Sequence, residues 1–316
     1  MRTVQASSTI WRKSRFAEKR TLLRKDWRLY VLLLPGVVYF ALFKYLPMWG
    51  ILFAFQNYVP HKGVWSSEWV GFAHFIRFFQ EPAFWMLFKN TMILAVLNLF
   101  IYFPIPIILA LLLNELRSQL FKRVVQTVIY IPHFISWVVV VGIFYILFTT
   151  EGGLVNEVIK ASGGDTIAFL LEPDWFRTLI TSQVIWKEAG WGTIIFLAAL
   201  TGVDPGLYEA ARMDGANRWH QIWHITLPAI RSTIVIMFIL RLGNFLDSNF
   251  EQIFLMINPM NREIGEVYDT YVYTVGLQMG QFSYTTAVNL FKNGVGLILI
   301  VVANYMAKKF GEEGVY

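Results

Sequence analysis

Two apolar segments of this chain are interrupted by polar and aromatic side chains that could line a path for a ligand. Segment 179–200 contains two indoles beside a lysine and a glutamate, and segment 230–255 contains an arginine with several amides and carboxylates. Polar groups inside a membrane are expensive and normally face a pore or a partner, while indoles can stack on apolar ring faces and amides and carboxylates can bond hydroxyl groups. The candidate substrate-path residues are Trp186, Lys187, Glu188, Trp191, Arg241, Asn244, Asp247, Asn249 and Glu251.

The same charged residues also fit a structural role. Lys187 and Glu188, or Arg241 and Asp247, can form buried ion pairs or contact a second subunit, because charges in apolar surroundings need partners. The sequence leaves both interpretations open. Further candidates on the last apolar segment are Asn289, Lys292 and Asn293.

Enzymatic chemistry is not indicated by any residue pattern in the sequence. The chain has no cysteine and no phosphate-binding loop of the form G-x-x-x-x-G-K-[ST]. Of its five histidines, only His220 and His224 have metal-ligand spacing, and no third ligand accompanies them. We therefore expect no catalytic residue, no metal site and no cofactor on this chain.

The composition indicates a membrane protein that crosses the bilayer several times. Hydrophobic residues make up 56% of the 316 residues and charged residues 15%, whereas soluble proteins carry about 25% charged residues. Spans need about 20 mostly apolar residues, and we place about six of them, which predicts an all-α transmembrane bundle. Counts of five or eight remain open because charges interrupt the last three. The predicted spans are 29–55, 92–113, 124–148, 179–200, 230–255 and 286–306.

The distribution of basic residues predicts the orientation of the chain. Seventeen lysines and arginines lie in the two termini and in the connections after the second and fourth spans, and six lie in the other connections. Positive residues favour the cytoplasmic side, so both termini are expected in the cytoplasm of a multi-pass cell-membrane protein. We predict a basic tail over 1–28 that binds anionic lipid and not nucleic acid, a transmembrane domain over 29–309 and a C-terminal tail over 310–316.

Two outer connections have patterns of their own. Segment 67–89 places Phe72, Phe75, Ile76 and Phe79 at helical spacing, which predicts an amphipathic helix on the membrane surface. Segment 151–177 is acidic and rich in glycine, which favours a solvated loop.

The connection 204–228 is predicted to form two short helices separated by a glycine. Asp204 can cap the first helix with Pro205 in its first turn, and Gly215 can adopt the left-handed conformation that ends it. Trp219 and Trp223 then begin an apolar stripe with Ile222.

At this connection the chain resembles the permease subunits of binding-protein-dependent ABC importers. Their signature is E-A-A, three residues, G, nine residues and I-x-L-P, and the sequence matches every fixed position. The resemblance implies a type I importer permease fold in which this loop docks on an ATP-binding subunit and couples ATP hydrolysis to transport. The implied coupling residues are Glu209, Ala210, Ala211, Asp214, Gly215, Ala216, Ile225, Leu227 and Pro228.

Further segments resemble the carbohydrate branch of that family. They include 32–48, 70–79, 84–91, 121–132 and 152–156, and segment 270–288 resembles the subgroup for polysaccharide fragments. The resemblance implies that residues at the places of Trp186 and Trp191, and asparagines on the following span, touch sugar. It also implies four kinds of partner: a second similar permease, two ATP-binding subunits that hold ATP and magnesium, an extracytoplasmic sugar-binding protein and an oligosaccharide substrate.

Two alternatives from other functional classes compete with this interpretation. An ion-coupled sugar symporter predicts inverted repeats and broken helices, and no repeat is visible in the sequence. A membrane-embedded glycan enzyme predicts a cluster of acids or metal ligands at the membrane surface. Copurification with an ATPase would distinguish the permease, the symporter and the enzyme interpretations.

Overall fold

The computed structural model describes residues 26–309, which fall into two compact units that divide between Leu52 and Phe53. In the first unit, α2 (Trp27–Phe40) continues through a π-helical turn, η1 (Ala41–Tyr45), into η2 (Leu46–Phe55). Trp27–Phe55 is long and apolar enough to cross a membrane, which confirms a helical first span. The predicted tails fall mostly outside the described residues, at 1–25 and 310–316.

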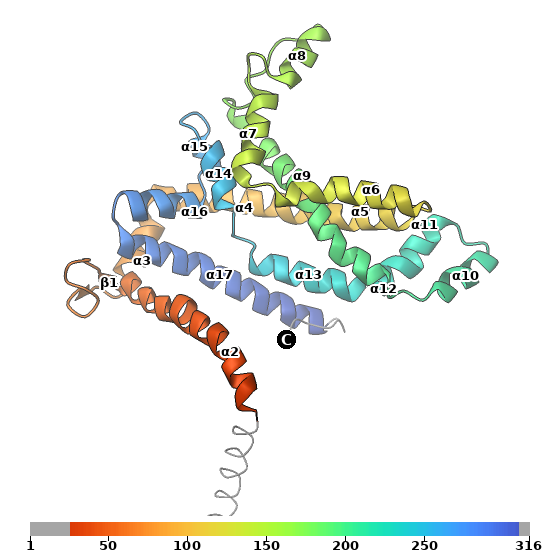
Figure 1. Ribbon diagram of the computed structural model, residues 1–316. Coiled ribbons are helices and arrows are strands. Elements are labelled where there is room, and N and C mark those ends of the chain that lie inside the picture. The colour runs from red at the N-terminus through yellow and green to blue at the C-terminus, as the bar shows by residue number, and fades with distance from the viewer. Residues whose placement is uncertain (1–25, 310–316) are drawn as a thin grey trace, which may run out of the picture. The chain divides into compact units, whose positions relative to one another are not determined.

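The second unit is built almost entirely of helices (Figure 1). Within the part of the chain that the structure describes, the only sheet pairs β1 (Gln56–Asn57) with β2 (Glu68–Trp69) as a short antiparallel hairpin. The next three predicted spans correspond to α4 (Pro82–Leu97), η3 (Asn98–Tyr102), α5 (Pro104–Asn114), α6 (Gln119–Tyr130), η4 (Ile131–Phe134), α7 (Trp137–Phe148) and α9 (Pro173–Leu200). The connection 204–228 contains α10 (Pro205–Met213), α11 (Arg218–Gln221), η5 (Ile222–Thr226) and α12 (Leu227–Ala229). The fifth span contains α13 (Arg231–Gly243) and α14 (Phe250–Met256), and the last corresponds to α17 (Phe282–Lys309). Between these two spans lie α15 (Arg262–Gly265), α16 (Tyr268–Tyr271) and η6 (Val272–Gln278).

The all-α class is confirmed, and the described residues contain three unbent candidate spans, or six when each bent helix pair counts as one span. The bent pairs include Gln119–Phe134 with Trp137–Phe148, which meet at 104°. The predicted third span is therefore broken near its middle. The fifth is also broken, because α13 ends at Gly243 and α14 starts at Phe250. Apolar length alone carries no information on such breaks.

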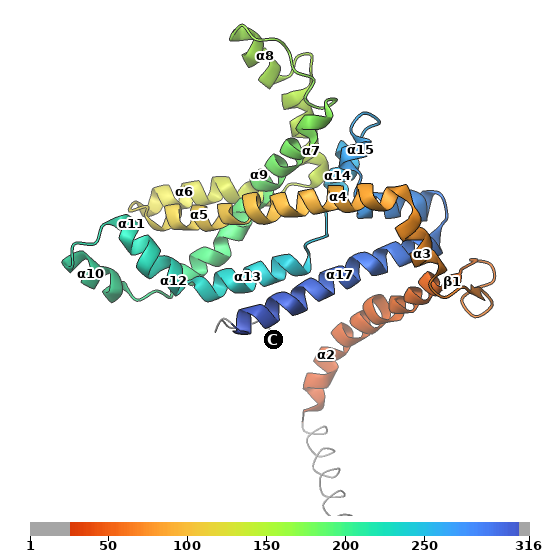
Figure 2. The ribbon, with the colours of Figure 1, turned by 180° about the vertical axis from the view of Figure 1, so that it is seen from behind.

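The two longest helices, α9 and α17, organise the packing of the second unit. α5 packs against α9, and α13 runs beside α17, as views from opposite sides show (Figure 2). The largest buried cluster joins α7 and α9 through Val140, Phe144, Phe176 and Ile180. Smaller clusters join α5, α9 and α13, so α9 contacts helices on several sides. Polar residues on α9 are consequently placed at the centre of the bundle.

The predictions for the two outer connections were partly wrong. Segment 67–89 is divided into β2, an eight-residue helix α3 (Ala73–Gln80) and the start of α4, because Pro82 begins a new helix. Phe72, which precedes α3, and Ile76 on α3 are exposed as the pattern predicted, but Phe78 is fully buried. Segment 151–177 contains a helix, α8 (Leu154–Ala161), whose buried Asn156 hydrogen-bonds to both the backbone carbonyl and the amide of Ile167. The charge and glycine content of segment 151–177 gave no indication of these hydrogen bonds of Asn156.

Candidate functional site

The connection between α9 and α13 begins with the helix and glycine turn that its sequence predicted. Asp204 caps α10 by accepting a hydrogen bond from the backbone amide two positions on, at 2.8 Å. Gly215 has φ of +80° and donates its amide to the carbonyl of Arg212 at 3.1 Å. The amide of Ala216 donates to the carbonyl of Ala211 at 2.9 Å. These two bonds form a Schellman motif, which requires the left-handed conformation that glycine adopts without strain.

The second half of this connection is tied to the first by side chains. Asn217 caps α11, and the Gln221 amide donates to the carbonyl of Ala216 at 3.0 Å. The hydroxyl groups of Tyr208 on α10 and Thr226 on η5 lie 3.0 Å apart. The two short helices therefore form one internally bonded unit, residues 204–226, which leads directly through α12 into α13 and is called the docking unit after its predicted role.

The predicted coupling residues line the outside of this unit. Its apolar stripe is exposed too, since the exposed fractions of Trp219 and Trp223 are 70% and 62%. Of the predicted set, Glu209, Ala210, Asp214, Gly215 and Pro228 are exposed, and Ala211, Ala216, Ile225 and Leu227 are half-buried. A projecting surface with small, charged and aromatic side chains suits docking into a groove of another protein.

A concavity of about 950 Å³ separates this unit from the turn that joins α5 to α6. Glu209 and Arg212 line one side of it, and Asn114 and Arg117 line the other. Arg218 forms an ion pair with Glu115 at 2.8 Å across the same region. The α5–α6 turn thereby supports the docking unit.

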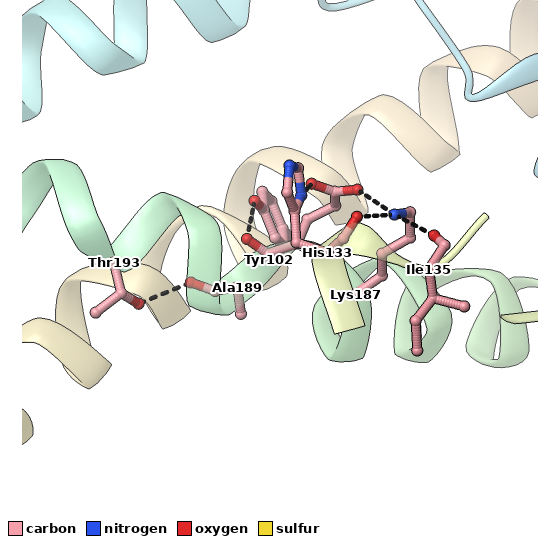
Figure 3. Close-up of polar contacts among 7 residues, drawn as sticks. Tyr102, His133, Ile135, Lys187, Ala189 and Thr193 are labelled. Atoms are coloured by element: carbon pink, nitrogen blue, oxygen red, sulfur yellow. Dashed lines mark hydrogen bonds and ion pairs between the residues drawn. The ribbon is translucent and has the colours of Figure 1, made fainter. Parts of the chain in front are cut away.

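Within the bundle, Lys187 lies at the break of the third span. Its Nζ donates to the backbone carbonyls of His133 and Ile135 at 2.6 and 2.7 Å (Figure 3). Only 6% of the residue's surface is exposed, so its ammonium group bonds the backbone at the break and not solvent. Helix ends buried without partners for their carbonyls are costly in a membrane, and this lysine supplies two of those partners.

Glu188, the next residue on α9, reaches the same break. Its Oε2 lies 2.8 Å from Nδ1 of His133, and its Oε1 lies 3.6 Å from the ammonium of Lys187. The imidazole of His133 stacks on the indole of Trp191, with centroids 4.5 Å apart and an interplanar angle of 6°. The expected Lys187–Glu188 pair is thus present within a larger group that includes an aromatic surface.

The group extends to the second and fifth spans through the π-helical turn η3. The Tyr102 hydroxyl donates to the Glu188 backbone carbonyl at 3.3 Å (Figure 3). Arg241 on α13 lies over the Tyr102 ring, 5.0 Å from its centroid, and donates to Asn98 Oδ1 at 3.1 Å. Tyr102 is therefore held between α9 and α13. The polar contacts join the second to fifth spans into one polar network.

The alternative ion pair of Arg241 with Asp247 is not present among the described residues. Asp247 instead lies 2.5 Å from the ammonium of Lys292 on α17, which also contacts Asp269 at 2.5 Å. Arg241 lies near the end of α13, and the chain leaves the helix before Asp247, so the two side chains no longer share a helix face. Lys292, a lesser candidate from the sequence, joins α17 to the break of the fifth span and to α16.

The remaining candidates lie in three separate places. Asn244 lines a small cavity with Asn98, Arg241 and Asp247, and this cavity includes neither candidate tryptophan. Asn249 and Glu251 are exposed at the start of α14. On α9, Trp186 and Trp191 keep 41% and 46% of their surface. The structure therefore groups Lys187, Glu188 and Trp191 in one site and Arg241, Asn244 and Asp247 in another, linked through Tyr102.

Sequence reasoning missed three members of this network. His133, Asn98 and Tyr102 all lie in predicted spans, and the one available signal was their polarity in an apolar segment. For His133 the preceding Pro132 added a second signal, because proline cannot continue a helix without a break.

Comparison with known proteins assigns the chain a family model. Residues 102–311 match the model described as "Binding-protein-dependent transport system inner membrane component". This match covers more than half of the chain, from the end of η3 through the connection 204–228 to just beyond α17.

Curated relatives and a solved structure agree with that match over nearly the whole chain. The chain is 57% identical to the polygalacturonan/rhamnogalacturonan transport system permease protein YteP of Bacillus subtilis strain 168, over 100% of both chains. It is 56% identical to Protein LplB of the same organism, over 93% of this chain and 92% of that protein. A chain of the bacterial alginate ABC transporter, solved in complex with an alginate pentasaccharide-bound periplasmic protein, superposes with a TM-score of 0.87 and 40% identity, covering 93% of this chain and 99% of that one.

Proposed function

Because this chain belongs to the family of binding-protein-dependent transport system inner membrane components, we propose that it is the permease subunit through which oligosaccharides or polysaccharide fragments enter the cell. The observation that carries the proposal is the 57% identity, over the full length of both chains, to a permease named for polygalacturonan and rhamnogalacturonan transport. The chain is an ABC transport subunit and not an enzyme, so the glycan enzyme and the ion-coupled symporter weighed from the sequence are not retained.

The partners follow from the family and from the exposed docking unit. We propose a second, similar permease beside this chain, two ATP-binding subunits that hold ATP and magnesium beneath α10 and α11, and an extracytoplasmic sugar-binding protein on the opposite face. Membrane lipid surrounds the helices, and no nucleic acid is involved. The chain lies in the cytoplasmic membrane with both termini in the cytoplasm.

The proposed mechanism is alternating access. Closure of the ATP-binding subunits moves α10 and α11; α10 is bonded to η5, which follows α11, and the chain continues through α12 into α13. Arg241 lies on that same helix and contacts Asn98 and Tyr102 of the second span. Movement of the docking unit therefore acts on a span that reaches the polar network.

The proposed sugar path contains the two half-exposed indoles, Trp186 and Trp191, and the polar groups at the break of the fifth span. An indole stacks on the apolar face of a sugar ring, and amides and carboxylates bond its hydroxyl groups. Asn244, Asp247, Asn249 and Glu251 are exposed at that break and supply such groups.

The test is reconstitution of the full transporter in proteoliposomes with its partner permease, ATPase and binding protein. Labelled oligogalacturonides, rhamnogalacturonan fragments and neutral arabino-oligosaccharides are supplied outside, with ATP inside. We expect ATP-dependent uptake of at least one acidic fragment, unaffected by ionophores that collapse ion gradients. Uptake without ATP, or uptake of none of these sugars by an assembled complex, would contradict the proposal.

A further inference from the structure

The third span breaks where its polar backbone needs partners from elsewhere. η4 ends at Phe134 and α7 begins at Trp137, so the carbonyls of His133 and Ile135 lie in a bend of 104° and not in a continuous helix. Both carbonyls accept hydrogen bonds from Lys187 of α9. One side chain of an unbroken 28-residue helix thus supports the break at two points.

Glu188 fixes the side chain of the residue whose backbone Lys187 holds. Its carboxylate contacts Nδ1 of His133, while its own backbone carbonyl accepts the hydroxyl of Tyr102. The imidazole is therefore restrained from both its main chain and its ring. In that orientation it lies parallel to Trp191, and the exposed ring of Phe134 meets the same indole edge-on at 6.1 Å.

We propose that Lys187 and Glu188 are positioning residues that assemble a sugar-stacking platform from His133 and Trp191. Lys187 acts through the carbonyls of the break and not through contact with sugar, since its Nζ is engaged and the residue is buried. The platform offers a half-exposed aromatic surface, which suits the apolar face of a pyranose ring. This inference rests on the proposed function and adds to it how the path is held in shape.

A comparison with Lys292 separates this role from that of an ordinary buried lysine. Lys292 also lies buried on an unbroken 28-residue helix, but its acceptors are the carboxylates of Asp247 and Asp269. Removing it leaves two acids without their counter-charge. Removing Lys187 frees two backbone carbonyls at a break and leaves Glu188 with His133 as its partner, so the main expected result is a displaced break.

The experiment uses the reconstituted transporter and three variants on α9. Lys187→Met keeps the length of the side chain without its donors, Lys187→Arg keeps a cationic side chain with several donors, and Glu188→Gln keeps one acceptor without charge. The control is Thr193→Val, which removes a buried hydroxyl that donates to the Ala189 carbonyl on the same helix, away from the break (Figure 3). Assembled complex, stimulated ATPase activity and sugar transported per ATP are measured for each.

We expect Lys187→Met to lower sugar transported per ATP at least fivefold, with stimulated ATPase activity per assembled complex within twofold of the parent. Lys187→Arg and Thr193→Val should stay within twofold on both measures, and Glu188→Gln should fall between. A second readout uses Ser136→Cys as a reporter in the break of this cysteine-free chain. Its maleimide labelling rate should change at least threefold with Lys187→Met and not with Lys187→Arg.

The outcomes distinguish this inference from the proposed function. If the parent complex transports none of the sugars supplied, the proposed function fails. If the parent transports sugar and Lys187→Met keeps both its yield of sugar per ATP and its Ser136→Cys labelling rate, the positioning role is overturned. Should Lys187→Met not assemble, Glu188→Gln decides, because normal sugar per ATP in that assembled variant also overturns the proposal.

Discussion

Gly190 of α9 lies directly against the backbone carbonyl of Ile129 on α6, so that a Cβ at residue 190 would be 1.9 Å from that oxygen. Two positions on, a Cβ at Gly192 would meet the ring of Pro106 on α5 at 3.0 Å. These two glycines let α9 approach two helices closely. That approach places Lys187 and Trp191 beside the break of the third span.

A methyl group at this crossing should disrupt it. Gly190→Ala cannot be accommodated by side-chain rotation, because the obstacle is backbone, and overpacking of this kind costs about 1–3 kcal/mol. We expect a lower melting temperature and less assembled complex, measured by thermal denaturation and size-exclusion chromatography in detergent. The control is Gly142→Ala on α7, where nothing lies within 4 Å of the added Cβ. If both variants behave like the parent, the close contact of α6 with α9 is wrong.

Helix positions and the docking unit could be predicted from sequence because both depend on local signals. Apolar runs mark the spans, and Asp204, Pro205 and Gly215 mark the ends of α10 through capping and backbone preference. The outer segments were predicted less well. Asn156 anchors a helix within a stretch that looked like loop, and its partners become visible only when the chain has folded.

The polar network could be predicted in composition but not in pairing. Lys187 bonds carbonyls more than 50 residues away, and a carbonyl has no signature in the sequence. Arg241 and Asp247 were paired by proximity in sequence, whereas the break after Gly243 directs Asp247 to Lys292 instead. Where helices break, spacing rules that assume a continuous helix no longer apply.

Loss of the indole at residue 191 should impair transport more than stability. Trp191→Ala removes the stacking partner of His133. Because Trp191 is 46% exposed in the parent, truncating it opens no closed cavity. Stacking contributes about 1 kcal/mol beyond area, and we expect several-fold slower sugar uptake with basal ATPase activity and assembly intact.

Trp191→Phe serves as the matched control, since it retains an aromatic face. Uptake and assembled complex are measured together, because a core tryptophan would cost about 3–5 kcal/mol on truncation and reduce assembly. Reduced assembly of Trp191→Ala with unchanged transport per complex would make the residue structural.

The glycine turn of the docking unit should be required for coupling. Gly215→Pro cannot adopt φ of +80° and has no amide to donate to the Arg212 carbonyl, so the Schellman motif is lost. We expect loss of uptake and of sugar-stimulated ATPase activity, with normal membrane insertion. Gly215→Asn is the control, because asparagine tolerates the left-handed conformation, and it should retain most activity.

Charge reversal tests the same unit without altering its backbone. Glu209→Lys changes an exposed side chain that lines the concavity beside α10, and it should abolish stimulated ATPase activity. Glu157→Lys on α8 makes the same exposed charge change away from this unit and should have little effect. Normal stimulation of a reconstituted Glu209→Lys complex would refute coupling through this loop.

The orientation of the chain is tested by single cysteines on the two sides of the bundle. Ser118, which caps α6, and Ser162, at the end of α8, are both exposed, and the chain has no other cysteine. The excess of basic residues predicts that the turn before α6 is cytoplasmic and the loop after α8 is outside. In intact cells an impermeant maleimide should therefore label Ser162→Cys alone, and after permeabilisation it should label Ser118→Cys as well. Labelling of both residues from one side would require a different number of spans between α6 and α8, since a pair of helices that crosses once must place its ends on opposite faces.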